Sequence, residues 1–239
     1  GGQPTVPRMR HAYGVLGPVL IGQTNTLFGG LIGLPELLDD GGPMGAGALR
    51  VPQIRYSHNF GGGLVLSVAL EDDAQRGDAG TNIVGGACTA ANVCAAMTAA
   101  AFGPAGTFLG PQRWPVVTAA LQWNFPNGAA YASGMIGQLD VDNGGAGLTG
   151  LARNDSSIRW GGSLGGRYDF GRVEIGGTGY VGEGIGTRAG GPVLFGPDAI
   201  VIANTANNGT SLRTPLSYGV TAYVQVKLTD TIRATGAYS

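Results

Sequence analysis

Residues 158–183 read IRWGGSLGGRYDFGRVEIGGTGYVGE, and this stretch decides the fold. From Ile158 to Phe170 every second residue is aromatic, aliphatic or glycine, whereas the residues between them include two arginines and an aspartate. A period of two is the pattern of a β-strand whose two faces meet different surroundings. Gly171 predicts a tight turn, and the alternation resumes after it. The stretch therefore predicts a β-hairpin with one apolar and one charged face.

Two classes of protein carry such a hairpin. In a soluble sandwich the apolar face points into the core. In a membrane barrel the apolar face points at lipid, and the charged face lines the lumen. The rest of the chain has to decide between these two classes.

The composition restricts the choice. The chain has 239 residues, of which 43% are hydrophobic and 12% charged. This share of charged residues is about half that of a typical soluble domain. This chain is too apolar to be disordered, and its 46 glycines follow no collagen period. No run approaches the roughly 18 apolar residues of a membrane helix. A membrane location would therefore require strands closed into a barrel.

The charges favour anions as ligands. A net charge of -1 argues against a general nucleic-acid binder. Of the 14 basic residues all but Lys227 are arginine. Arginine is preferred where planar anions are held by paired hydrogen bonds.

Cys88 and Cys94 are the two cysteines, in the segment CTAANVC. We expect them to form a small disulfide loop in an oxidising compartment, and the alternative is two unpaired thiols. We expect no metal site, because His11 and His58 lie far away in sequence, and the chain suggests no cofactor.

The alternation predicts ten strands, at residues 8–15, 19–25, 51–60, 64–71, 115–125, 129–139, 158–170, 172–183, 216–228 and 232–238. Their length of about 9 to 13 residues in most cases fits a tilted span of a bilayer better than it fits soluble strands. Aromatic residues near the strand ends are expected in interfacial girdles: Tyr13, Phe60, Trp123, Phe125, Trp160, Phe170 and Tyr218.

The connections between these strands alternate in length. Short links lie at 16–18, 61–63, 126–128, 171 and 229–230, and long ones at 26–49, 72–113, 140–157 and 184–214. All tight turns therefore fall at one end and all long loops at the other, as in bacterial outer-membrane barrels. We predict an all-β, transmembrane, antiparallel up-and-down β-barrel.

Five segments also resemble a known family: RMRHAYG, GPVLIGQTNTLF, QIRYSHNFGGGLVLSVALED, GGRYDFG and GYVGEGIG. They are similar to the trimeric outer-membrane porins of the dicarboxylate-channel, or DcaP-like, type. The resemblance implies a homotrimer in the bacterial outer membrane, in contact with lipid and lipopolysaccharide, and a barrel of about 16 strands. With ten strands here, we expect residues 1–239 to form a single porin domain that is incomplete at both ends.

If the apolar faces meet lipid, the opposite faces bring eight cations against the three carboxylates Glu71, Asp169 and Glu174. Such a lumen would favour anionic solutes. The alternative is that the arginines pair with these carboxylates and fill space. The predicted solute-binding residues are Arg8, Arg10, Arg55, Arg159, Arg167, Arg172, Lys227 and Arg233.

Glu36, Asp39 and Asp40 are the charges of the first long insertion. The insertion is long enough to fold into the pore, where an acidic loop facing an arginine wall would set a transverse field. An ordinary solvated external loop is an equal alternative.

Two motifs with enzymatic associations occur within predicted strands. Residues 161–165 fit G-x-S-x-G, but a nucleophile elbow needs a strand-to-helix turn and a later histidine. Residues 177–182 fit G-x-G-x-x-G, but no helix follows them. We therefore expect no catalysis. The predicted function is passive passage of small anionic solutes, such as dicarboxylates or similar organic acids, through an outer-membrane porin. The alternative is a surface β-barrel adhesin or scaffold with a plugged lumen.

Overall fold

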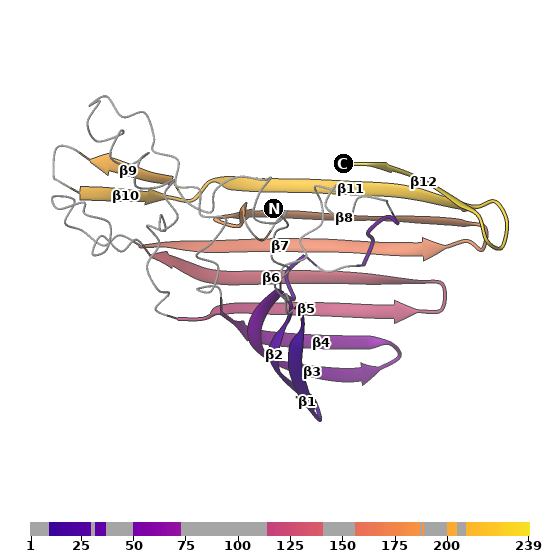
Figure 1. Ribbon diagram of the computed structural model, residues 1–239, viewed down its shortest axis with the longest axis horizontal. Coiled ribbons are helices and arrows are strands. Elements are labelled where there is room, and N and C mark those ends of the chain that lie inside the picture. Colours follow the sequence, from indigo (N-terminus) through magenta and orange to yellow (C-terminus); the bar gives the residue numbers. More distant parts are fainter. Residues whose placement is uncertain are drawn as a thin grey trace, which may run out of the picture.

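The fold is a meander of ten antiparallel strands, seen in a computed structural model that describes residues 10–29, 32–36, 50–72, 114–140, 156–186, 188, 200–204 and 209–239 (Figure 1). Each strand pairs with the next one along the sheet, in the order β1-β2-β3-β4-β5-β6-β7-β8-β11-β12. The strands are β1 Ala12–Leu16, β2 Val19–Asn25, β3 Arg50–Gly61, β4 Leu64–Glu71, β5 Val116–Phe125, β6 Gly128–Asp140, β7 Ser156–Asp169, β8 Val173–Glu183, β11 Leu216–Lys227 and β12 Arg233–Tyr238. The predicted all-β up-and-down topology is confirmed.

Two further strands were not predicted. β9 Ile200–Asn204 and β10 Gly209–Arg213 form a separate two-stranded antiparallel sheet, within the segment expected to be a long loop. Each has five residues, which is too short for a period of two to stand out from the surrounding sequence.

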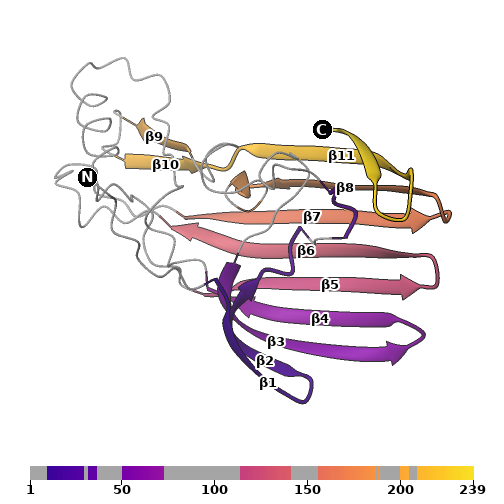
Figure 2. The ribbon, with the colours of Figure 1, turned by 45° about the vertical axis from the view of Figure 1, so that its right-hand side comes forward.

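The short turns lie together at one end of the sheet. Figures 1 and 2 show the β3–β4, β5–β6, β7–β8 and β11–β12 turns at that end, opposite the longer connections. Glycine makes two of these turns tight, because Gly62 and Gly171 have φ angles of 59° and 91°, which side chains disfavour. The predicted alternation of short and long links therefore corresponds to the two ends of the sheet, one with the short turns and the other with the longer connections.

The exposure of the two faces is the reverse of that in a soluble protein. Large apolar side chains are exposed on one face, including Leu164 at 69% and Val220 at 62%. Glu71 and Thr118 on the other face are fully buried. We call these the apolar face and the polar face. Exposed apolar and covered polar side chains are the arrangement expected of a sheet whose outer surface meets lipid.

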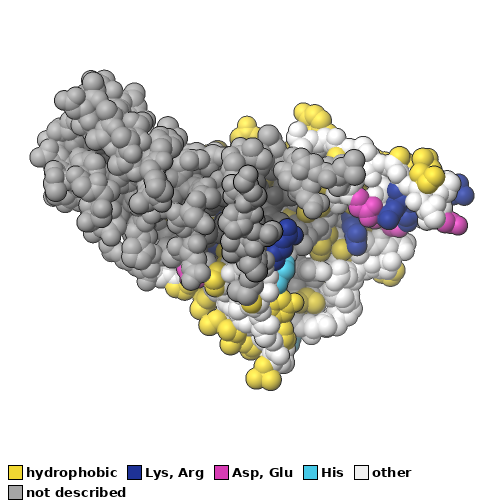
Figure 3. Space-filling view, viewed as in Figure 1, with side chains coloured by type: hydrophobic (Ala, Val, Ile, Leu, Met, Phe, Trp, Pro, Cys, Tyr) yellow, Lys and Arg dark blue, Asp and Glu magenta, His cyan; other side chains and the backbone are white. Residues whose placement is uncertain are grey.

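The space-filling view shows the same separation from outside. Hydrophobic side chains gather along the margin of the sheet around β1–β4 (Figure 3). Lysine, arginine and acidic side chains gather at the short-turn end of β8, β11 and β12.

Aromatic rings mark the apolar face at the short-turn end. Trp123, Phe125, Tyr168 and Phe170 form a chain of ring contacts with centroids 4.9, 6.1 and 4.6 Å apart. Trp160, on the same face of β7, lies eight residues from Tyr168, or about 26 Å along the strand and about 20 Å after a tilt of about 40°. These two levels are close to the separation expected of the interfacial girdles of a membrane barrel.

β1 departs from the prediction. We expected Tyr13 and Val15 on the apolar face, with Arg10 on the side of Ala12. The register instead places Tyr13 and Val15 opposite Gly22 and Leu20, and Leu20 lies opposite Arg55 on the polar face.

That face assignment of the first strand is therefore wrong, including the interfacial place of Tyr13. Arg10 precedes the paired residues of β1, and its place on the polar face stays a prediction. The residues from 12 to 16 are uncharged on both sides, so alternation alone could not orient the strand. Gly22 allows the close approach of β1, because a Cβ there would lie 2.3 Å from the carbonyl oxygen of Ala12.

Among the described residues, none of the helices has the length and hydropathy to cross a membrane.

A charge placed at mid-depth on the apolar face tests which face meets lipid. Leu164→Arg should lower the free energy of unfolding in lipid vesicles by about 2–4 kcal/mol, because an arginine near the bilayer midplane is poorly solvated. Leu216→Arg, at the long-loop end of β11, should cost about 0–1 kcal/mol. Equal small losses for both variants in denaturant titrations would place this face in water.

Candidate functional site on the polar face

Five of the predicted cations lie on the polar face. Cross-strand partners share a face, so the register assigns each of them to the side that carries Thr118 and Ser163. The pairs are Arg55 with Ala69, Arg159 with Gly137, Arg167 with Ala129, and Lys227 with Arg233. Arg172 lies instead in the β7–β8 turn, where it is exposed, and Arg8 lies outside the described residues.

These five cations do different things. Arg159 is fully buried. Arg55 is half-buried, and it donates hydrogen bonds to Gln53 Oε1 at 2.9 Å and to the carbonyl oxygen of Asn25 at 2.6 Å. Lys227 and Arg233 form ion pairs, and only Arg167 is an exposed guanidinium for which the described residues show no ion pair. From the sequence, all five residues had the same predicted role of binding a solute. The structure distinguishes cations that bond within the protein from the one that is exposed and has no ion pair among the described residues.

The carboxylate of Glu71 is the centre of a buried network at the long-loop end. It accepts hydrogen bonds from Thr26 Oγ1 at 2.7 and 3.0 Å, from the amide of Leu27 at 3.0 Å and from Thr118 Oγ1 at 2.8 Å. Arg188 completes the network, with Nη1 2.5 Å from Glu71 Oε2 and 3.0 Å from Thr26 Oγ1. Glu71 and Arg188 are both 0% exposed, so the charge of the carboxylate is matched by an arginine inside the protein.

The sequence did not point to Thr26, Thr118 or Arg188 as members of a network. Thr26, Thr118 and Arg188 lie 45, 47 and 117 residues from Glu71, so the network joins four separate segments of the chain, that of Glu71 included. Only the register of the folded sheet brings these segments together. The one usable signal was Glu71 itself, a carboxylate on the polar face of a strand.

The segment after β2 crosses the polar face. The amide of Gly29 donates to Ser163 Oγ on β7 at 3.2 Å. Gly33 packs so closely on the carbonyl groups of Gly166 and Gly177 that a Cβ there would lie 2.2 Å from the Gly177 oxygen. We call residues 26–29 and 32–36 the crossing segment.

Glu36 ends the crossing segment on the far side of the sheet. Its carboxylate accepts hydrogen bonds from Gln225 Nε2 at 3.1 Å and from Arg233 Nη1 at 3.0 Å. Glu36 therefore contacts residues of β11 and β12 on the polar face, with its side chain 63% exposed, and the inward acidic loop stays a prediction. Asp39 and Asp40 lie outside the described residues, as do Cys88 and Cys94 with their predicted disulfide.

A small apolar cluster holds the crossing segment from beneath: Phe28, Val116, Met135, Tyr180 and Ile185. Gly161 lies directly under Phe28, and a Cβ there would be 2.9 Å from the phenyl ring. Glycine on this part of β7 therefore provides the space in which the segment packs.

The enzymatic motifs are parts of strands, as expected. Ser163 lies within β7, where its hydroxyl is 2.9 Å from that of Ser133 and accepts the amide of Gly29. Residues 177–182 lie within β8. Within the described parts of the chain, no group of three histidine, cysteine or acidic residues could hold a metal ion.

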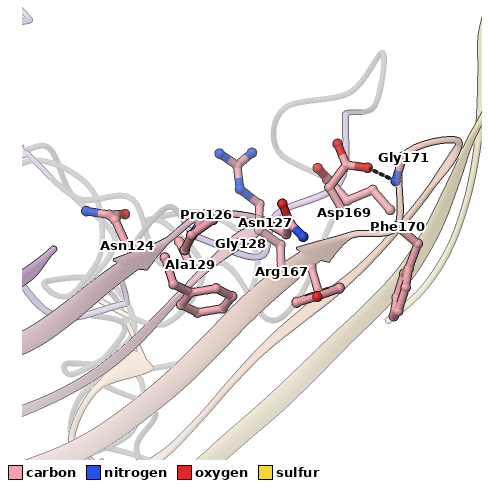
Figure 4. Close-up of a pocket in the computed structure, with 12 residues that line it drawn as sticks. Asn124, Pro126, Asn127, Gly128, Ala129, Arg167, Asp169, Phe170 and Gly171 are labelled. Carbon is pink, nitrogen blue, oxygen red and sulfur yellow. Dashed lines mark hydrogen bonds between the residues drawn. The ribbon is translucent and has the colours of Figure 1, made fainter. Parts of the chain in front are cut away.

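The short-turn end of the polar face is more open. A hollow of about 700 Å³ there is lined by residues of the β5–β6 and β7–β8 turns and by Arg167 and Glu174 (Figure 4). Asp169, which also lines the hollow, accepts a hydrogen bond from Lys227 Nζ at 2.8 Å, and Glu174 accepts one from the hydroxyl of Tyr223 at 2.7 Å. Both carboxylates of this end are thus already engaged.

The Glu71 network should dominate the stability of the long-loop end. Glu71→Ala should lower the free energy of unfolding by about 3–5 kcal/mol, because it removes the carboxylate from a buried ion pair. Thr118→Val removes one hydrogen bond of the same network and should cost about 1 kcal/mol. A loss below 1 kcal/mol for Glu71→Ala in equilibrium unfolding would contradict this role.

Comparison with known proteins agrees with the geometry. Residues 1–97 match the family model described as DcaP outer membrane protein. No curated protein sequence matches the chain. The crystal structure of the outer membrane channel DcaP of Acinetobacter baumannii is similar, with a TM-score of 0.67 and 21% sequence identity over 96% of this chain and 54% of that one.

The chain thus spans about half the length of that channel protein, and at 21% identity the likeness concerns the fold. The similar structure is that of a channel protein, and the matching family model is that of an outer membrane protein. The first 97 residues resemble the DcaP outer membrane proteins, and the strand architecture resembles that of the DcaP channel, so both likenesses support a place in the bacterial outer membrane.

Proposed function

We propose that the chain forms part of the wall of an outer-membrane porin, with residues 1–239 in a single barrel domain, and that small anionic solutes pass along its polar face. One observation carries this proposal: the apolar side chains are exposed and the polar side chains covered, which is the arrangement of a barrel with a polar lumen. Lipid and lipopolysaccharide would then meet the apolar face. By its resemblance to the family, the protein would assemble as a homotrimer.

Anion preference in this proposal depends on few residues. Three cations of the polar side are neutralised by ion pairs: Arg188 with Glu71, Lys227 with Asp169 and Arg233 with Glu36. Arg159 is buried, and Glu174 is held by Tyr223. Among the described strand residues of the polar face, the half-buried Arg55 and the exposed Arg167 therefore carry the positive charge that no ion pair neutralises and that solvent can reach. A lumen with this modest excess would favour anions and reduce the entry of cations.

The crossing segment would form the constriction. It brings Glu36 against Arg233, so a carboxylate and a guanidinium face the passing solute together. Opposed charges set up a transverse field, which would sort solutes by dipole as well as by charge. The predicted role of Arg172 becomes a contribution to the field at the mouth, since this residue lies in the exposed turn.

A plugged barrel used for adhesion or scaffolding is the second candidate. The observation that favours it is the packing of Phe28 and Ile185 on the polar face, which fills space that a solute would need. Conductance separates the two candidates directly. The complete protein, reconstituted in a planar bilayer, should give open channels if it is a porin, and a closed bilayer would support the plugged barrel.

Selectivity tests the two accessible arginines. The double variant Arg55→Gln with Arg167→Gln should move the reversal potential in a potassium chloride gradient toward the cation side, because two positive charges leave the wall. The lysine versions Arg55→Lys with Arg167→Lys should keep the original value, since they keep the charge. An identical reversal potential for the wild type and the glutamine variant would rule out these residues as the source of selectivity.

A further inference from the structure

The crossing segment lies directly on the backbone of the sheet at two glycines of β7. Gly161 lies under Phe28, and a Cβ added to Gly161 would be 2.9 Å from the Cζ atom of the phenyl ring. Gly165 lies under Ile32, and a Cβ added to Gly165 would be 2.9 Å from the carbonyl oxygen of Ile32. Non-bonded carbon atoms prefer a separation of about 3.5–4.0 Å. A side chain at either glycine would therefore need space that the crossing segment already fills.

Further contacts hold the crossing segment along β7 and onto β8. Ser163 lies between the two glycines on the same face of β7, because alternate residues of a strand share a face. Its Oγ accepts a hydrogen bond from the amide of Gly29 at 3.2 Å. On β8, a Cβ added to Gly33 would lie 2.2 Å from the carbonyl oxygen of Gly177. The crossing segment therefore follows β7 and then meets the backbone of β8.

Glycines of the polar face also lie under aromatic rings of the sheet itself. A Cβ added to Gly165 would be 2.6 Å from Cε1 of Tyr131, and one added to Gly176 would be 2.5 Å from Cε1 of Tyr223. A strand glycine often marks a place where another group comes close to the backbone. The pattern keeps bulky groups close to the sheet and leaves more of the space above it open.

Space, and not backbone conformation, accounts for glycine at these positions of β7. Neither Gly161 nor Gly165 has a positive φ angle, so an L-residue could adopt the same backbone conformation. Gly162, on the apolar face between them, differs in its surroundings. A Cβ added to Gly162 would meet only the carbonyl oxygen of Ser133 within 4 Å, at 4.0 Å. The close packing above β7 is therefore a property of the glycines on the polar face.

We propose that Gly161 and Gly165 are positioning residues that hold the crossing segment close to the wall and so set the largest solute that the pore admits. The inference rests on the proposed porin function and adds a size limit to it. A side chain beneath the crossing segment would push the segment away from the sheet, toward the side proposed to be the lumen. This limit applies equally to neutral and charged solutes, so it is separate from selection by charge.

Gly161→Val tests the size limit in the complete protein, reconstituted in planar bilayers with potassium chloride. The variant should lower the single-channel conductance by about a third or more, because an overpacked site is relieved by backbone shifts. Neutral polyethylene glycols of graded mass measure the size limit, since only polymers that enter the pore reduce the current. Gly161→Val should exclude smaller polymers than the wild type excludes. The reversal potential in a salt gradient should stay at the wild-type value, because no charge changes.

Gly162→Val is the matched control. It makes the same substitution at the next residue of the same strand, but on the apolar face, where the added side chain meets open space. Its conductance and its polymer size limit should equal those of the wild type. An equal fall in conductance for Gly161→Val and Gly162→Val would show a general effect on β7 and would overturn the proposal.

A compensating change above the glycine distinguishes positioning from a general loss of structure. The double variant Gly161→Val with Phe28→Leu keeps the total number of side-chain carbon atoms, and volume-conserving exchanges are tolerated best. It should recover the conductance and the size limit of the wild type. If Gly161→Val alone does not fold, the double variant still carries the test. A double variant that does not fold, or that keeps the smaller size limit, would overturn the proposal.

The same recordings separate this inference from the porin proposal. A conducting wild type whose size limit is the same as that of Gly161→Val would overturn the positioning role and leave the porin proposal standing. A wild type without conductance would overturn the porin proposal, and the size limit with it.

Discussion

The buried carboxylate of Glu71 is the interaction on which the interior of this protein depends. It accepts hydrogen bonds from Thr26 and Thr118 and forms an ion pair with Arg188, so it joins the ends of β2, β4 and β5 to the segment that follows β8. A charge that is 0% exposed needs such partners, because an unpaired buried carboxylate would cost several kcal/mol. The crossing segment begins at this anchor, and its position on the polar face follows from it.

The distribution of charge follows from the same constraint. At the long-loop end, Glu71 and Arg188 are used to hold the chain in place. At the far side of the crossing segment, the pair between Glu36 and Arg233 is half exposed, and such pairs contribute about 0–1 kcal/mol. Toward the short-turn end, Arg167 has small neighbours and no ion pair among the described residues. Along the polar face, the cationic side chains at the long-loop end therefore hold the structure together, and those toward the short-turn end are accessible. The proposed anion path uses the accessible side chains.

Much of the fold could be predicted from the sequence, because a period of two and the order of short and long links are local signals. The hairpin of β7 and β8 has the predicted faces, and the short turns meet at one end. The face of β1 could not be predicted, since its residues are uncharged on both sides. The site was predicted only as a set of cations on one face. Which of them are paired or buried depends on contacts such as Arg188 with Glu71, which join segments 117 residues apart and leave no local pattern.

Quenching of tryptophan fluorescence by brominated lipid is the most direct test of the central claim, that the apolar face meets lipid and the polar face meets water. Single-tryptophan variants would keep either Trp160 on the apolar face or a tryptophan introduced as Gln122→Trp on the polar face. In vesicles of brominated phospholipid, the account predicts strong quenching of Trp160 and little quenching at position 122. Equal quenching at the two positions, or stronger quenching at position 122, would contradict it.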